Sequence, residues 1–182
     1  MLKKVKVTAT KDLDRMFTGK IIDEINLIYS SGGDLSPLLK EKEMAICEFT
    51  KKRYPVEEIV GSIECLVRDF PILFLTDLDI YYADLDYVYG FTDPERGVSV
   101  VSLARLKKGA STKKIFERAV KTAIHEIGHL NDLRHCKNKG CVMFLSFGLK
   151  DTDRKDKWFC DKCLEKLLAN RTGGTNEARN SC

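Results

Sequence analysis

Apolar and polar residues recur with clear periods along the chain, and these periods predict its strands and helices. Residues 3–9 alternate between the two classes, which predicts a strand. Residues 12–30 place apolar side chains three and four positions apart, as on one face of a helix. Residues 43–49 suit a second strand, and a helix continuing from Pro37 is the alternative.

The same signals continue through the middle of the chain. Pro55 opens a helical pattern that runs to about residue 70. Residues 71–82 begin as an unbroken apolar run, which predicts a buried strand. Residues 87–93 and 97–106 are joined by a short polar turn and predict a hairpin or an adjacent strand pair. Residues 112–131 again have helical spacing, so helices alternate with strands and predict an α/β or α+β fold.

Composition narrows the class of protein. The chain has 182 residues, 43% of them hydrophobic and 32% charged, which is the size and make-up of one globular domain. We expect that domain to span residues 1–170, and residues 171–182, which lack apolar anchors, to form a disordered tail. Charges interrupt every apolar stretch long before the ~20 residues of a membrane span. The first residues lack the apolar core of a secretory signal, so we expect a cytoplasmic protein with no membrane partner.

Cysteine and histidine are concentrated in one region. The chain has 7 Cys and 3 His, and all the histidines and four of the cysteines fall within residues 125–163. In a reducing compartment such clustering points to metal rather than to disulfides. Cys47 and Cys65 have apolar neighbours and are expected in the core, and Cys182 is expected to be a free thiol.

The first chemical motif is H-E-x-x-H within the helix predicted over residues 112–131. His125 and His129 are four residues apart, share a helix face and are therefore able to bind one zinc ion. Glu126 is placed to take a proton from a zinc-bound water, whose pKa the metal lowers to about 7.

A catalytic zinc needs a third protein ligand, and His135 is the candidate. It lies ten residues after His125, so it reaches the same ion only if the helix ends and the chain turns back. Related long motifs place glycine at the turn, whereas this sequence has Asp132 there. Asn and Asp are the non-glycine residues that best tolerate the left-handed region, at a cost of about 1 kcal/mol. We therefore expect Asn131 and Asp132 to end the helix.

The second motif is a set of four cysteines in two short pairs. Cys136 and Cys141 are followed, after an 18-residue loop, by Cys160 and Cys163. This spacing is typical of a closed structural zinc site. Because Cys136 directly follows His135, such a site would fix where that histidine points.

Together the motifs HExxH…HC-x4-C-x-M…C-x2-C resemble the archaemetzincin family of metzincin zinc peptidases. The strands preceding the motif helix are similar as well, and the resemblance covers about residues 43–167. It implies a metzincin-like fold with a twisted mixed sheet, an active-site helix, a Met-turn, a four-cysteine zinc subsite and a C-terminal helix.

The resemblance also implies roles. Glu126 would be the general base and acid, and Met143 the Met-turn methionine. A short peptide substrate would lie along an exposed edge strand, expected at residues 87–90, where Tyr87, Tyr89 and Arg105 either contact it or simply pack. Two zinc ions per chain are implied. The catalytic ion would be held by His125, His129 and His135, and the structural ion by Cys136, Cys141, Cys160 and Cys163.

Two other functions remain open on the sequence alone. The first is a catalytically inactive zinc-binding or interaction module with two structural metal sites, although a carboxylate at Glu126 would have no use there. The second is a four-cysteine module that binds nucleic acid, since residues 91–182 carry 19 Lys and Arg against 11 Asp and Glu. Acidic residues are interspersed with the basic ones around Trp158, so we expect no nucleic-acid partner.

Overall fold

The computed structural model describes residues 5–10, 12–31, 51, 53–67 and 70–172. The strand expected at 43–49, Cys47 and Cys182 lie outside these residues. Among the described helices, none is both long and apolar enough to cross a membrane.

The described chain forms the following elements in order: β1 (Lys6–Ala9), α1 (Arg15–Ser31), β2 (Arg53–Pro55), α2 (Val56–Ile63), the 3-10 turn η1 (Glu64–Leu66), β3 (Ile72–Thr76), β4 (Asp79–Tyr81), β5 (Gly90–Asp93), β6 (Val98–Ser102), α3 (Thr112–Leu130), α4 (Leu149–Arg154) and α5 (Asp161–Thr172).

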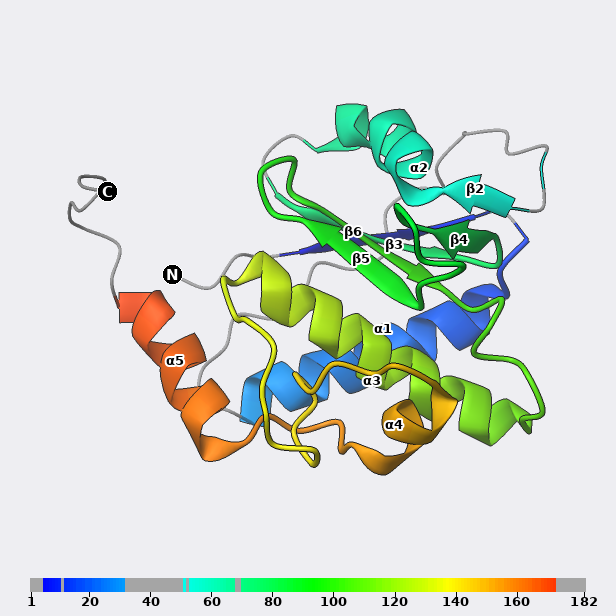
Figure 1. The fold of residues 1–182 in the computed structure, drawn as a ribbon. Coiled ribbons are helices and arrows are strands. Elements are labelled where there is room, and N and C mark those ends of the chain that lie inside the picture. Colours follow the sequence, from blue (N-terminus) through cyan, green and yellow to red (C-terminus); the bar gives the residue numbers. More distant parts are fainter. Residues whose placement is uncertain (1–4, 11, 32–50, 52, 68–69, 173–182) are drawn as a thin grey trace.

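A four-stranded sheet with the order β1-β3-β6-β5 separates two helical layers (Figure 1). β1, β3 and β6 run parallel, and β5 is antiparallel to β6 at the edge. β2 and β4 form a second, two-stranded parallel sheet. The fold is therefore the mixed α/β architecture expected from the sequence.

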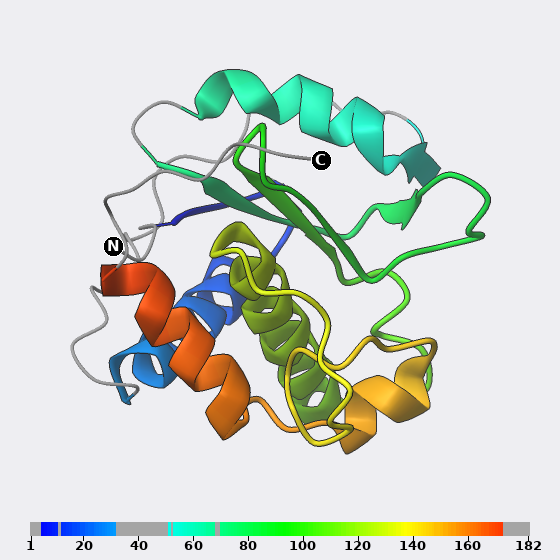
Figure 2. The same ribbon diagram turned by 60° about the vertical axis from the view of Figure 1, so that its left-hand side comes forward.

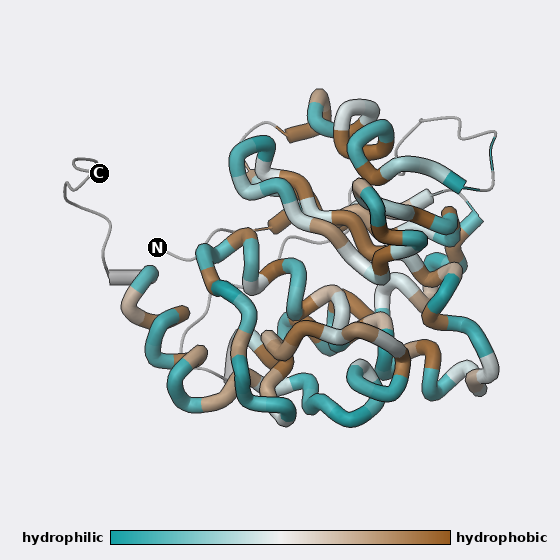
Figure 3. Tube along the Cα trace, in the orientation of Figure 1, coloured by the Kyte–Doolittle hydropathy of each residue, from teal (hydrophilic) through white to brown (hydrophobic). Residues whose placement is uncertain are grey.

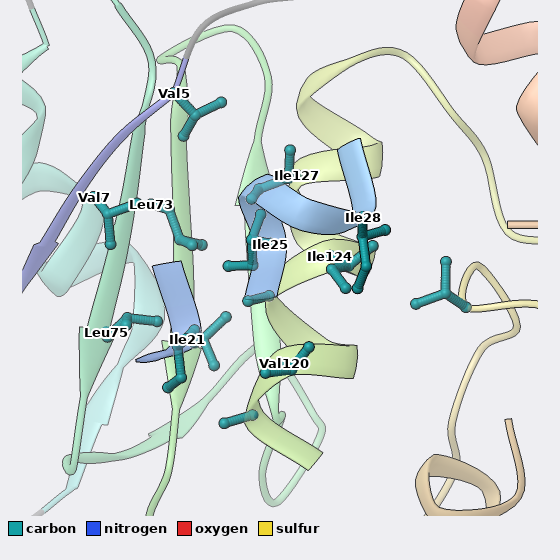
Figure 4. Close-up of a cluster of buried hydrophobic side chains, with 14 of the residues drawn as sticks. Val5, Val7, Ile21, Ile25, Ile28, Leu73, Leu75, Val120, Ile124 and Ile127 are labelled. Atoms are coloured by element: carbon teal, nitrogen blue, oxygen red, sulfur yellow. The ribbon is translucent and has the colours of Figure 1, made fainter. Parts of the chain in front are cut away.

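Alternate residues of the sheet face opposite layers. Ile72 and Phe74 pack with α2, whereas Leu73 and Leu75 pack with α1 and α3. Figure 2 shows α2 alone on one face of the sheet and the other helices on the opposite face. Figure 4 shows the larger cluster, in which Val7 on β1 lies next to Leu73 on β3, with side chains of α1 and α3 in the same cluster.

Hydropathy along the chain follows these layers. In Figure 3 hydrophobic residues run along the central strands and recur in the helices that cover them, and hydrophilic residues dominate the outer loops. Every position of β3 and β6 is buried, as expected for strands covered on both faces. The apolar side chains of β3 and β6 thus form the buried centre of the sheet against which α3 packs.

Several predicted boundaries were wrong. The helix expected over residues 55–70 is α-helical only to Ile63, because the chain must become extended at Val67 to enter β3. The strand expected over 71–82 is interrupted at residues 77 and 78, where the Thr76 hydroxyl accepts the Leu78 N–H and the chain passes to the second sheet.

The edge strand is also displaced from its expected position. It begins at Gly90 rather than spanning residues 87–90. Before Gly90 the chain bonds to the second sheet, since the Val88 N–H donates to the Ile80 carbonyl of β4. The bond from the Ser102 N–H at the end of β6 to the Tyr89 carbonyl marks where pairing with β6 begins. At the other end, α5 continues to Thr172, past the start expected for the tail.

A bidentate ion pair from a buried arginine fastens α4 to α3. The Arg118 guanidinium, whose side chain is only 7% exposed, donates to both carboxylate oxygens of Asp153 at 2.8 Å. It also donates to the carbonyls of Leu106 and Lys108. This pairing holds the pKa of Asp153 below its usual value. A six-residue helix cannot sustain itself, so this contact fixes its place.

Replacing Asp153 tests that contact. Asp153→Asn leaves a buried guanidinium without its counter-charge and should lower the free energy of unfolding by about 2 kcal/mol at neutral pH. Because the folded state lowers the Asp153 pKa, its contribution is full above the unfolded value near 4 and disappears as pH falls through the folded value.

Urea unfolding of both proteins at neutral and acidic pH measures this difference. Glu117→Gln on the same helix breaks only a 3.8 Å ion pair on the surface and should cost little. An Asp153→Asn effect that persists unchanged in acid would contradict the assignment.

Candidate metal and catalytic site

Helix α3 carries three of the residues singled out in the sequence. His125 and Glu126 are buried and His129 is half-buried, all near its C-terminal end. The Ser111 side chain accepts the Lys114 N–H and caps the start of the helix. The motif residues therefore lie in the last two turns of a long helix that packs against β5 and β6.

The end of α3 turns the chain back as the sequence predicted. Asp132 has φ of 65°, in the left-handed region. The Leu133 N–H bonds the Gly128 carbonyl at 3.0 Å, and the Asp132 N–H bonds the His129 carbonyl at 3.0 Å. These two bonds form a Schellman motif. The reversal returns His135 to the first two histidines.

The three imidazoles converge through their Nε2 atoms. His125 Nδ1 donates to the Val142 carbonyl at 2.8 Å, and His129 Nδ1 donates to the Leu133 carbonyl at 2.7 Å. A carbonyl only accepts, so the proton is on Nδ1 and the Nε2 lone pair is free. His129 Nε2 lies 3.1 Å from that of His125 and 3.2 Å from that of His135.

This triangle of nitrogens fits a zinc ion. Tetrahedral Zn–N bonds of about 2.0–2.1 Å place the ligand nitrogens roughly 3.3 Å apart. Burial lowers the pKa of His125, His129 and His135, which keeps the rings neutral and able to bind a metal.

The four cysteines form a second convergent set. The Sγ atoms of all four lie within 4.8 Å of one another, and those of Cys136 and Cys160 are 3.8 Å apart. Zn–S bonds of about 2.3 Å require roughly this separation. Burial raises the pKa of the Cys141 and Cys163 thiols, so a bound cation is what would make them thiolates.

Backbone groups also support this cluster. The Cys160 N–H donates to Cys141 Sγ at 3.3 Å, and the Asn138 N–H donates to Cys136 Sγ at 3.4 Å. The N–H of Cys136, the residue after His135, donates to the Met143 carbonyl at 2.9 Å, so the cysteine segment and the segment of Met143 are bonded to each other. Cys65 is the remaining cysteine within the described residues. It was expected in the core, but it is exposed.

Glu126 is held against the edge strand by residues that sequence reasoning missed. Its Oε2 accepts the Thr92 hydroxyl at 2.7 Å, and Thr92 Oγ1 lies 2.7 Å from Ser99 Oγ. A Cβ atom added to Gly90 would stand 2.4 Å from Glu126 Oε1, so only glycine lets the carboxylate lie so close to β5. Burial raises the pKa of Glu126 to about 7, and the Thr92 hydrogen bond opposes this rise.

Met143 supports the histidine cluster from below α3. A Cβ on Gly128 would lie 2.5 Å from the Met143 sulfur, so the thioether rests directly on the helix backbone between the two motif histidines. Met143 is fully buried. The same glycine therefore admits Met143 and accepts the Leu133 N–H that reverses the chain.

Two cavities flank Glu126. The first, of about 400 Å³, extends toward α4. The second, of about 800 Å³, extends over the histidines and the edge strand. Both are lined by Gly90, His125, Glu126 and Leu145, so they meet at the site.

The three other residues considered as substrate contacts fall into two groups, according to whether they line a cavity. Tyr87 and Tyr89 line the first cavity and pack edge to face. Arg105 lines neither cavity and donates to both carboxylate oxygens of Asp79. The structure therefore places Arg105 in a structural ion pair.

Comparison with known proteins gives consistent matches. Residues 11–169 match the sequence model described as Peptidase family M54. Archaemetzincin of Pyrococcus furiosus is 34% identical over 128 residues, which cover 66% of this chain and 67% of that protein.

Solved structures match over nearly the whole chain. The crystal structure of archaemetzincin from Methanopyrus kandleri superposes with a TM-score of 0.81 at 28% identity, covering 93% of this chain and 95% of that one. A zinc-dependent peptidase from Methanocorpusculum labreanum gives 0.77 at 25% identity, with 90% and 99% covered.

Substitution of Asp132 tests the reversal on which the histidine cluster depends. Asp132→Gly removes the left-handed cost and should keep or raise the free energy of unfolding by up to about 1 kcal/mol. Asp132→Val forces a β-branched residue to positive φ and should lower it by about 1–2 kcal/mol.

Urea unfolding of the metal-saturated proteins measures both effects. Asp132→Asn, which tolerates the same backbone conformation, is the matched control. Equal stability of the glycine and valine variants would contradict the role given to this turn.

Proposed function

The chain belongs to peptidase family M54, the archaemetzincins, and is a zinc metallopeptidase; from this premise we propose which residues perform the hydrolysis. The observation that carries the proposal is the convergence of three imidazole Nε2 atoms beside the buried carboxylate of Glu126. His125, His129 and His135 would hold the catalytic zinc.

Glu126 acts as the general base and then as the general acid. A zinc ion held by the three histidines would supply a Lewis acid to polarise the peptide carbonyl and to lower the pKa of water to about 7. Glu126 Oε2 is engaged by Thr92, so Oε1 accepts the proton of the attacking water. The carboxyl then delivers this proton to the nitrogen of the leaving amine.

The edge strand positions the substrate. In the described part of the chain β5 pairs only with β6, so its other edge is open to an extended peptide. Backbone hydrogen bonds along β5 would hold the peptide with little sequence preference. The two cavities on either side of Glu126 would receive the side chains next to the scissile bond.

A second zinc on Cys136, Cys141, Cys160 and Cys163 has a structural role. Four sulfur ligands would leave no open position for substrate, and an ion held by them would fix the segment that carries His135 and Met143. We assign Met143 as the Met-turn methionine because its sulfur lies under the helix that bears the other two ligands.

Replacement of Glu126 tests the catalytic assignment. Glu126→Gln preserves shape and removes the base, so turnover of a fluorogenic peptide library should fall by about 10²- to 10⁴-fold. Elemental analysis should give two zinc ions per chain in both proteins.

The same measurements show which part of the proposed function is wrong if the expected results are not obtained. Two zinc ions without turnover in the wild-type protein would favour a non-catalytic metal module. One zinc ion that survives His135→Ala would show that only the cysteines hold metal. Cys160→Ser should instead lose the structural ion and lower the free energy of unfolding.

Gly90 provides an independent test that leaves every proposed ligand in place. Gly90→Ala pushes Glu126 Oε1 from its position and should lower kcat by about 10²-fold, since a displacement near 1 Å has that effect. Gly61→Ala in α2, where an added Cβ meets nothing within 4 Å, is the control and should leave kcat unchanged. Unaltered turnover in Gly90→Ala would place the base elsewhere.

A further inference from the structure

The cavity of about 400 Å³ beside Glu126 contains a buried lysine that the proposed hydrolysis does not use. Lys155 follows the last residue of α4 and is 3% exposed. Its cavity is formed by α3, the segment before β5, the loop after Met143 and the end of α4. Because Gly90 and Glu126 also line it, this cavity opens onto the reacting atoms.

The ammonium group of Lys155 has donors to spare. Its Nζ donates to the Phe144 carbonyl at 3.1 Å, and this is one of three N–H groups. Within the described residues, no carboxylate oxygen lies close enough to this nitrogen, at 4.0 Å or less, to form an ion pair with it. Glu126 and Asp151 attract it from a greater distance.

A cation in this position calls for a counter-charge. Burial lowers the pKa of Lys155 to about 8, so the charged form still dominates at neutral pH. Removing an ammonium from water is costly unless it is paired and hydrogen-bonded. A contact with one carbonyl holds the loop but does not balance the charge.

A second polar group in the same cavity lacks a partner. Ser146 Oγ is buried, has no hydrogen-bond partner in the structure, and lines the cavity with Lys155. An oxyanion is the group that accepts from both an ammonium and a hydroxyl. The acidic Asp86 also borders the cavity, but it is exposed and therefore screened by water.

The rest of the lining suits a hydrocarbon stem. Leu85, Val88, Leu145 and Phe147 all border this cavity, and Phe147 is 80% exposed. Apolar walls that lead to a few polar groups fix the orientation of a bound side chain. The complementary group has an aliphatic stem and a terminal negative charge.

Resting on the proposed peptidase function, we infer that this cavity is a subsite for a substrate carboxylate next to the scissile bond, with Lys155 as the specificity-determining residue and Ser146 as a second donor. The carboxylate belongs either to an acidic side chain or to the C-terminus of the peptide. Both sources present the same chemical group, and two series of peptides distinguish an acidic side chain from a C-terminal carboxylate.

Binding rather than turnover is the primary measurement. Isothermal titration in the Glu126→Gln background uses alanine peptides with both ends blocked and one central Glu, Gln or Leu. A second pair of alanine peptides differs only in a free or amidated C-terminus. If Lys155 recognises a carboxylate, the acidic member of at least one peptide series binds about 10- to 100-fold more tightly than its neutral counterpart.

Two substitutions assign the preference to residues. Lys155→Met keeps the stem, removes the charge and should abolish the preference, and Ser146→Ala should reduce it several-fold. Lys150→Met is the matched control, because Lys150 is an exposed lysine of the same helix, α4, and does not line the cavity. The control should keep the full preference.

Each result has a definite meaning. Equal affinity for Glu, Gln, Leu and both C-terminal forms overturns the subsite, as does a preference that survives Lys155→Met. Should Lys155→Met fail to fold by circular dichroism and zinc content, the wild-type ratios and Ser146→Ala still decide. A carboxylate preference in a wild-type protein that shows no turnover would overturn the proposed function and leave the cavity as a carboxylate-binding site only.

Discussion

The reversal at the C-terminal end of α3 is the constraint on which the site depends. A straight helix would carry His135 roughly 15 Å along the axis from His125, at about 1.5 Å per residue. The left-handed residue Asp132 and the two Schellman hydrogen bonds bring it back beside His129 instead. Because Cys136 is the next residue, the same turn also delivers the first member of the cysteine set.

Orientation of the histidines comes from segments that this turn creates. The Leu133 carbonyl that fixes His129 lies in the turn itself, and the Val142 carbonyl that fixes His125 lies between Cys141 and Met143. Ligand rings are held by acceptors on their other nitrogen, so the cysteine segment is part of the histidine site. The two metal sets are therefore mechanically joined.

The local parts of this site could be predicted, and the parts brought together by the sheet could not. The i, i+4 spacing of His125 and His129 is a property of one helix, and the need for a left-handed residue near Asp132 follows from chain geometry alone. Thr92 and Ser99 reach Glu126 only because β5 pairs with β6 in one register, which no local pattern specifies. Pairing of other strands had a comparable effect elsewhere. The chain leaves the helix after Ile63 to enter β3, and the strand expected over residues 71–82 is divided because β4 pairs with β2 in the second sheet.

Lys155 illustrates how a short helix is held in a fixed position by its neighbours. Helix α4 has six residues, too few for intrinsic stability. Arg118 holds it through Asp153, and Lys121 donates to the carbonyls of Thr152 and Asp153. Both cations project from α3 one and two turns before His125, so the helix that presents the metal ligands also places the end of α4. Lys155 is thereby fixed relative to Glu126 by the backbone of α3, which is the rigidity that a specificity residue requires.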